Sequence, residues 1–288
     1  MKIGVDIGNS TTCTSEGILF DSKVSKSNQY LSEDGKIILN NETFYIEQGN
    51  FDSEYRKVRK QNYIRLLFGA LSKSIEEKVS EVELGLGLPL IQYKEDKNAL
   101  NELIMKNRIM EGNFEGTDRK FYITNVKVYP EAALSTPLGY EGIVIDIGGR
   151  TTDLCIIEQV GGRKKILKPS SIPNGIINLQ TNVISAVNSK LGLNLTIDDF
   201  SKIIKNGLKI YGVQQDLEFV RKIMKDWLES LLFDIDQEYN FKINQSIFCG
   251  GGSILLKKPI LKRVQGTTVV DDIFCNANAY KIMLEANL

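Results

Sequence analysis

Apolar and polar positions along the chain predict strands and helices in both halves. Strict alternation over five to eight residues is typical of strands, whereas apolar residues three to four positions apart are typical of helices. The first half then contains an opening apolar run over 3–7, short strands over 17–49, a helix over 53–78, a strand over 82–89, a helix over 94–110, a strand over 121–128 and a helix beginning at Pro130.

The second half repeats this arrangement with more helix. Its expected elements are a strand over 143–147, a second strand ending near Ile157, a strand over 165–167, helices over 176–191, 197–205 and 215–236, a strand over 246–249 and a short helix over 253–256. The longest of these helices carries an apolar face that indicates core packing. The pattern as a whole predicts an α/β protein.

An eight-residue segment occurs twice in matching contexts. Residues 5–12 and 145–152 are identical at five of eight positions, and each copy joins two strand-like runs. This predicts two β-hairpins with equivalent turns. A separation of 140 residues is too long for a solenoid repeat and favours a duplicated domain.

Composition and charge narrow the chemistry. With 36 basic and 36 acidic residues among 288, the formal net charge is zero, which argues against direct nucleic-acid binding driven by charge. The absence of histidine excludes Ser-His-Asp catalysis, imidazole bases and histidine-ligated zinc. A length of 288 residues predicts about two domains.

The remaining composition predicts a soluble cytoplasmic protein. No apolar run is long enough to span a membrane, and the N-terminal run contains an acid, as a strand would and a signal peptide would not. The four cysteines lie far apart in the sequence without a paired motif, which indicates reduced thiols.

The repeated turns predict two phosphate sites with metal anchors. A strand that ends in aspartate and runs into glycine presents a carboxylate and several backbone N–H groups at one point. Asp6 and Asp146 would hold a hydrated Mg²⁺. A hairpin turn without any ligand explains one copy equally well, but two copies favour the phosphate interpretation. The expected phosphate-binding residues are Gly8, Asn9, Ser10, Thr11, Gly148, Gly149, Arg150 and Thr151.

A third motif lies near the C-terminus. The segment Gly250, Gly251, Gly252 and Ser253 joins a strand to a helix, where glycines allow close approach of a planar ligand or simply a sharp turn. Together the three motifs supply the contacts that a nucleotide between two domains needs. No P-loop pattern is present, and Gly85 and Gly87 form only an incomplete dinucleotide fingerprint.

The order and spacing of these motifs resemble the actin-like ATPase superfamily. Three further stretches are most similar to the ParM-like bacterial actins, namely 87–93, 128–133 and 274–280. The resemblance implies an actin-like ATPase fold, with two duplicated domains around a nucleotide cleft. Domain I would cover 1–138, with 17–78 as a small subdomain and 268–288 returning to it, and domain II would cover 139–267.

The resemblance also implies roles for single residues. Asp6 and Asp146 match the magnesium-associated aspartates, and Glu131 matches the glutamate that orients the attacking water, although the residues alone leave a helix-dipole role open. Gly175 falls where the base-proximal loop passes. Asp153 is a lesser candidate for the metal shell, and solvation of the hairpin is the role favoured for it.

Two positions depart from the family pattern. Cys13 and Thr14 stand where actin carries a lysine after its first phosphate loop, so phosphate charge should be met by Mg²⁺ and backbone dipoles. Arg150 stands where small residues are usual, and it either points away from the nucleotide or contacts phosphate.

The implied function is an ATPase that polymerises into filaments, acts in plasmid DNA segregation and reaches DNA through a separate DNA-binding adaptor protein. GTP is an alternative nucleotide. The two rival functions are a small-molecule kinase of the same superfamily, for which 17–78 offers no evident sugar pocket, and a non-hydrolysing nucleotide-gated scaffold, for which no membrane tail is evident. ATP-dependent assembly would discriminate between them.

Overall fold

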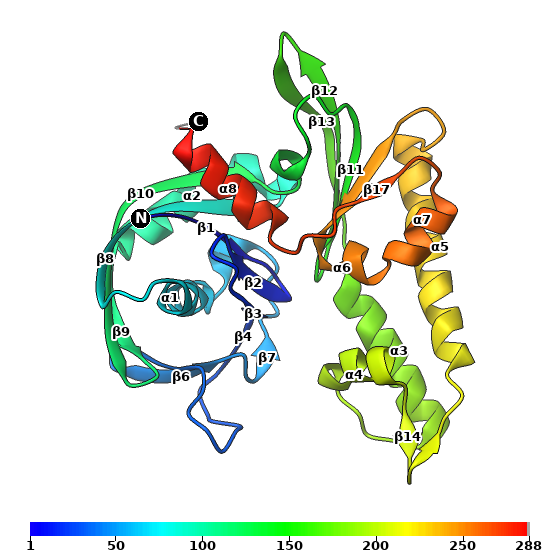
Figure 1. Ribbon diagram of the computed structural model, residues 1–288, viewed down its shortest axis with the longest axis horizontal. Helices are drawn as coiled ribbons and strands as arrows, with labels where there is room; N and C mark the ends of the chain where they lie inside the picture. Colours follow the sequence, from blue (N-terminus) through cyan, green and yellow to red (C-terminus); the bar gives the residue numbers. More distant parts are fainter. Residues whose placement is uncertain (287–288) are drawn as a thin grey trace.

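A computed structural model describes residues 1–286 and shows two α/β units, each built on its own sheet (Figure 1). The first sheet has ten strands in the order β3-β2-β1-β8-β10-β9-β5-β6-β4-β7. Its strands are β1 (Lys2–Ile7), β2 (Thr11–Thr14), β3 (Leu19–Asp21), β4 (Lys23–Ser25), β5 (Lys36–Leu39), β6 (Glu42–Ile46), β7 (Asn50–Phe51), β8 (Val79–Leu88), β9 (Ile109–Phe114) and β10 (Thr117–Pro130).

The helical segments of this unit are η1 (Lys57–Arg59), α1 (Tyr63–Ser74), α2 (Leu90–Lys106) and η2 (Ala133–Ser135). Figure 1 shows the sheet curving around α1. Leu67, Phe68 and Leu71 of this helix are fully buried, so α1 forms the centre of the first hydrophobic core.

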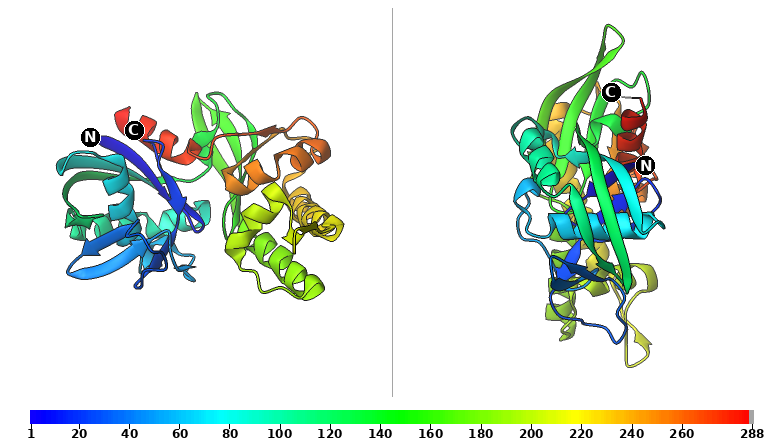
Figure 2. Two further views of the ribbon diagram at one scale, coloured as in Figure 1. Left: turned by 60° about the horizontal axis from the view of Figure 1, so that its bottom comes forward. Right: turned by 90° about the vertical axis from the view of Figure 1, so that its left-hand side faces the viewer.

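The second sheet has five strands in the order β13-β12-β11-β16-β17. They are β11 (Gly142–Ile147), β12 (Thr152–Val160), β13 (Arg163–Ile172), β16 (Ser246–Cys249) and β17 (Thr268–Val269), and β14 (Lys209–Ile210) pairs separately with β15 (Val213–Gln214). The helical segments are α3 (Ile176–Leu191), η3 (Ile197–Asp199), α4 (Phe200–Asn206), α5 (Glu218–Tyr239), α6 (Gly250–Leu255) and α7 (Lys257–Arg263). Figure 2 shows β12 and β13 extending beyond the body of the unit as a long hairpin.

The repeated segment forms two equivalent hairpins, as the sequence predicts. β1 pairs antiparallel with β2 and β11 with β12, and Ile7 opposite Thr12 corresponds to Ile147 opposite Thr152. Each hairpin also pairs in parallel with a third strand, β8 in the first unit and β16 in the second. The two sheets therefore share the same central arrangement.

The alternation of side chains along β11 decides which of them face the cleft between the units. Ile143, Ile145 and Ile147 pack in the core that α3 and α5 cover, whereas Val144 packs in a cluster with Leu90 of the first unit. Because side chains alternate along a strand, Asp146 lies on the same face as Val144. The hydrophobic pattern of the strand thus directs this carboxylate between the two units.

The chain returns to the first unit through α8 (Cys275–Glu285), which lies beside β1 in Figure 1. Glycines make this contact close: a Cβ at Gly4 would lie 1.9 Å from Ala277 O, and a Cβ at Gly87 1.9 Å from Tyr280 Oη. β17, at the start of the expected returning segment, instead pairs with β16 in the second sheet. Residues 287 and 288 of that segment lie outside the described residues.

Several helix boundaries differ from those expected. The helix expected over 53–78 is α1 alone, preceded by the short η1, and the helix expected over 94–110 begins at Leu90 and ends at Lys106. The last two residues of the expected range, Ile109 and Met110, instead begin strand β9, where Met110 lies opposite Phe121. The apolar periodicity of this segment did not reveal strand β9, because pairing with β10 stabilises it.

Two further expectations were wrong. No helix begins at Pro130: β10 runs through that residue, Glu131 N continues the ladder by donating to Leu88 O at 2.9 Å, and only the single turn η2 follows. At the glycine triplet, α6 begins at Gly250 itself rather than at Ser253.

Among the helices of residues 1–286, none has the length and apolar character needed to cross a membrane.

Candidate functional site

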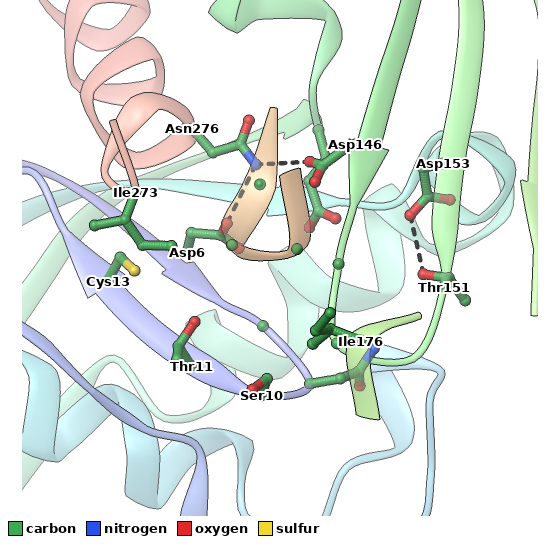
Figure 3. A pocket seen from close by; sticks show the side chains of 18 of the residues that line it. Asp6, Ser10, Thr11, Cys13, Asp146, Thr151, Asp153, Ile176, Ile273 and Asn276 are labelled. Atoms are coloured by element: carbon green, nitrogen blue, oxygen red, sulfur yellow. Dashed lines mark hydrogen bonds between the residues drawn. The ribbon is translucent and has the colours of Figure 1, made fainter. Parts of the chain in front are cut away.

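A cavity of about 340 Å³ lies between the two units, and most of the predicted site residues line it (Figure 3). Its floor carries carboxylates and its walls carry the three glycine-containing turns. The predicted residues that line it are Asp6, Gly8, Asn9, Ser10, Thr11, Glu131, Asp146, Gly148, Gly149, Thr151, Asp153, Gly250, Gly251 and Gly252.

The two Asp-Gly turns have the same internal geometry. Gly8 N donates to Thr11 O and Gly148 N donates to Thr151 O, both at 2.9 Å. The N–H groups of the two residues that follow each glycine make no hydrogen bond within residues 1–286. Groups of free amides at a tight turn bind anions, so each turn can hold a phosphate.

The two turns touch each other across the cleft. A Cβ at Gly149 would lie 2.8 Å from Ser10 Cβ, so a side chain at this position would push the units apart. Glycine is therefore needed at this position for the turns to approach this closely. Phosphates bound at one turn would also lie near the other.

Asp6 and Asp146 converge at the floor of the cavity. Asn276 Nδ2 donates to Asp6 Oδ2 and to Asp146 Oδ2, each at 3.3 Å. Burial, with the nearby carboxylates of Asp153 and Asp6, raises the pKa of Asp146 to about 7. A divalent cation would relieve this repulsion, and two carboxylates that meet from opposite units fit a hydrated Mg²⁺. No group of three metal-ligating side chains occurs in the described chain, so such an ion would also need phosphate and water ligands.

Lys57 is a site residue that the sequence did not reveal. Its Nζ lies 3.0 Å from Asp6 Oδ1 and forms an ion pair with Glu131, and only 2% of its side chain is exposed. Burial lowers the pKa of Lys57, but the carboxylates of Asp6 and Glu131 outweigh burial and hold it above its ordinary value. A lysine therefore reaches the cleft from η1, in addition to the Mg²⁺ and backbone dipoles that the sequence predicts as partners of the phosphates.

Lys60 lies behind Lys57 in the same segment. Its Nζ donates to Gly8 O at 3.2 Å, and burial together with Lys57 lowers its pKa to about 7. The only sequence signal for either lysine was the basic run over 56–60. Such runs are common on exposed helices, and this one lay inside an expected helix.

Arg56 fixes this segment to α2. Its Nε and Nη2 atoms donate to the two oxygens of Asp96 at 2.6 and 2.7 Å, and Nη2 also lies 2.7 Å from Glu95 Oε2. A bidentate pair of this kind fixes direction as well as distance. It therefore holds Lys57 in position facing the cleft.

Glu131 follows the last residue of β10 and faces the cavity. Burial raises the pKa of Glu131 to about 7, although the Lys57 ammonium acts to lower it. The helix-dipole role that the sequence left open requires a helix at this point. Since only η2 follows, the location at the cavity favours a role in the chemistry.

Three predicted site residues do not line the cavity. Arg150 points across to the first unit, where its Nη2 donates to Asp52 O at 2.8 Å. Ser253 is fully buried and its hydroxyl donates to Cys249 O. Gly175 lies behind the second turn, since a Cβ there would come within 2.5 Å of Gly149 O. These residues support the cleft from outside it.

A second contact joins the units on the side of the cleft far from α8. Lys23 of β4 is 4% exposed, forms an ion pair with Asp198 of η3 and lies 4.8 Å from the centre of the Phe51 ring. Figure 1 shows β4, β7 and α4 together on this side. With the bond from Arg150 to Asp52, it closes the cleft at its edge.

The two halves of the chain each match a family profile. Residues 4–133 match the N-terminal domain of actin-like proteins, and residues 144–262 match the C-terminal domain of the archaeal actin homologue described as MreB-like. The fold, the paired turns and these matches define its class: the chain belongs to the actin-like ATPase superfamily.

Solved structures give the more particular relationship. The chain is similar to the archaeal actin homologue Ta0583 over 100% of both chains, with a TM-score of 0.83 and 21% identity. It is similar to Bacillus thuringiensis ParM with AMPPNP over 99% of both chains (TM-score 0.71, 15% identity), and to the Alp12 filament structure over 100% of this chain and 99% of that one (TM-score 0.68, 17% identity). No curated protein matches the chain in sequence. The expected actin-like fold is confirmed.

Proposed function

We propose that this protein binds ATP with Mg²⁺ in the cleft, hydrolyses it and polymerises into filaments. One observation carries the proposal: two equivalent Asp-Gly turns, one from each unit, meet across a single cavity. A nucleotide that contacts both turns would couple its own state to the closure of the units.

Several residues of the cavity would take part in this reaction. The free amides of the two turns would bind the phosphates, and Asp6 and Asp146 would hold Mg²⁺, which neutralises phosphate charge when bound. Lys57 supplies a second positive charge at the floor. Glu131, which lines the cavity, would orient a water molecule for in-line attack on the γ-phosphate, and positioning and electrostatics would supply most of the acceleration.

The relatives support the nucleotide and the polymer. An archaeal actin homologue was solved in complex with ADP, a ParM was solved with AMPPNP and with ADP, and Alp12 was solved as a filament. We extend these properties to this chain on the basis of its own cavity. ATP is the proposed nucleotide and GTP the alternative.

Assembly is the direct test of this function. Right-angle light scattering and pelleting should increase when ATP and Mg²⁺ are added, and should not increase with buffer or with ATP and EDTA. A protein that stays monomeric under every nucleotide condition would contradict the filament proposal. Phosphate release measured in the same samples separates hydrolysis from assembly.

We further propose plasmid DNA as the cargo, bound through a separate adaptor protein. The balanced charge of the chain supports an indirect contact, since direct binding depends on clustered basic residues. In an electrophoretic shift assay at physiological salt, the filament-forming protein alone should leave duplex DNA unshifted. A salt-sensitive shift by the pure protein would contradict this proposal.

The ion pair at the edge of the cleft should slow nucleotide release. Asp198→Ala removes the partner of Lys23 in the second unit and leaves Asp21 of its own unit at 3.5 Å. Because Asp198 is 60% exposed, we expect a loss of about 1 kcal/mol, or roughly fivefold faster dissociation of ADP. Stopped-flow displacement of a fluorescent ADP measures this rate. Asp226→Ala is the matched control, because it removes the same charge from an exposed site without a partner in residues 1–286. Equal rates of ADP dissociation in the two variants would show that this ion pair does not affect nucleotide release.

A further inference from the structure

Asn276 lies in the first turn of α8 and contacts both units at the floor of the cleft. The two bonds from its Nδ2 reach Asp6 and Asp146, as the dashed lines in Figure 3 show. Its Oδ1 accepts from Ala132 N at 3.1 Å and from Ser135 Oγ at 2.8 Å. Asn276 is 7% exposed, so a single buried amide connects four partners.

Ala132 has a backbone conformation that requires such support. Its φ is +62° and its ψ is −51°, and Ala133 N donates to Glu131 O at 2.6 Å. These values describe a γ-turn of the strained, positive-φ kind. In a residue other than glycine, this conformation persists where the surrounding structure fixes it. By accepting the Ala132 N–H, Asn276 stabilises the turn that directs Glu131 into the cavity.

The position of Asn276 is itself fixed by the packing of α8. Its neighbour Ala277 lies directly on Gly4, and Tyr280 one turn later lies on Gly87. Ala277 and Tyr280 are both fully buried. The helix therefore cannot slide along the sheet without clashing with backbone, and the amide of Asn276 stays at one point.

We propose that Asn276 is a positioning residue for the nucleotide site. Its NH₂ group holds together two carboxylates that come from opposite units and that would otherwise repel each other. Its carbonyl fixes the turn next to Glu131. Asn276 thus sets the distance between the Mg²⁺ anchors and the direction of Glu131 at the same time. This inference rests on the proposed function, because it concerns the same cleft.

Two substitutions separate these contributions. Asn276→Ala removes all four hydrogen bonds, whereas Asn276→Asp keeps the oxygen that accepts from Ala132 and loses the NH₂ group. Asn278→Ala is the matched control: it changes the same residue type in the same helix, and Asn278 Nδ2 donates to Asp272 Oδ2 at 3.2 Å rather than to a carboxylate of the cavity floor. Thermal unfolding of each variant establishes that it is folded.

The measurements are kcat and KM for ATP hydrolysis and the Mg²⁺ concentration that half-saturates tight ADP binding. In Asn276→Ala we expect kcat to fall and the half-saturating Mg²⁺ concentration to rise, each roughly 10- to 100-fold, with a much smaller change in KM. A merely structural role would lower the unfolding temperature and leave kcat of the folded protein unchanged. In Asn276→Asp we expect kcat to stay low, because the bond to both carboxylates is lost.

Three results would overturn the inference: wild-type kcat and Mg²⁺ dependence in folded Asn276→Ala, an equal loss in Asn278→Ala, or full hydrolysis by Asn276→Asp. Failure of the proposed function gives a different result, since wild-type protein would then release no phosphate. In that case the Mg²⁺ dependence of ADP binding still tests the role of Asn276. An unchanged dependence in Asn276→Ala then overturns the inference, and a weakened one supports it.

Discussion

Glu131→Gln should slow phosphate release from ATP by about 10²- to 10⁴-fold, the range that a positioned general base contributes. The substitution keeps the size of the side chain and leaves an amide oxygen that can accept from Lys57, but it removes the carboxylate that would polarise the attacking water. ATP affinity should be retained, because the phosphate turns are unchanged. Phosphate release and fluorescent-nucleotide binding measure the two quantities on one sample.

Glu102→Gln is the matched control for this experiment. Glu102 is exposed on α2 and has no partner among the described residues. Glu102→Gln therefore removes the same charge as Glu131→Gln without changing the cleft. Unchanged phosphate release by Glu131→Gln would remove Glu131 from the mechanism. Loss of ATP binding together with hydrolysis would instead assign Glu131 a structural role.

Lys57→Met should lower the free energy of unfolding of the nucleotide-free protein by about 3–5 kcal/mol, the cost of leaving a buried charge without its partner. The variant leaves the carboxylates of Asp6 and Glu131 close together without their ammonium. Urea unfolding should therefore show a lower midpoint with an unchanged slope. Lys222→Met, at an exposed lysine without a partner in the described chain, should leave the midpoint unchanged.

The pH dependence of this loss distinguishes its cause. Burial already raises the pKa of Glu131 to about 7 in the presence of Lys57, and removal of the ammonium should raise it further. An acid whose folded pKa is raised destabilises the fold at pH values above its unfolded pKa, and the two proteins differ in this respect only between their folded pKa values. The deficit of Lys57→Met should therefore shrink as the pH falls from alkaline values towards 7 and change little below that. A deficit that is constant with pH would indicate lost packing.

The double variant Lys57→Met, Glu131→Gln provides the complementary test. Neutralising Glu131 removes one of the two uncompensated carboxylates, so the double variant should be more stable than Lys57→Met alone. Additive losses would show that the two residues do not interact in the folded protein.

Part of the fold could be predicted because its signals are local. The duplicated Asp-Gly turns, their flanking strands and α3 were recognisable from short apolar runs and glycine spacing, and the structure places both turns as expected. The helix expected at Pro130 failed because proline is compatible with a strand end as well as with a helix start. Pairing with β8, which is distant in sequence, decided between the two.

The site was predicted less completely, since several of its contacts are made by the tertiary structure alone. Lys57 reaches the cavity because Arg56 is held by Asp96 on α2, a contact that no local pattern encodes. Arg150 was named as a phosphate contact or an outward residue, and its bond to Asp52 depends on how the two units meet. Asn276 lay in a stretch that resembled the family without a role assigned to it.

The packing of α8 on the first sheet affects the order in which the two units can fold. The first unit is discontinuous, because the helix that covers Gly4 and Gly87 is encoded after the whole second unit. A nascent chain emerges from the ribosome with its N-terminus first, so this surface of β1 and β8 stays uncovered until the second unit has been synthesised. The second unit, whose strands and helices are nearly contiguous in sequence, can fold before the first is complete. Asn276 arrives with α8, so its hydrogen bonds to Asp6 and Asp146 at the floor of the cleft can form only after the second unit has been synthesised.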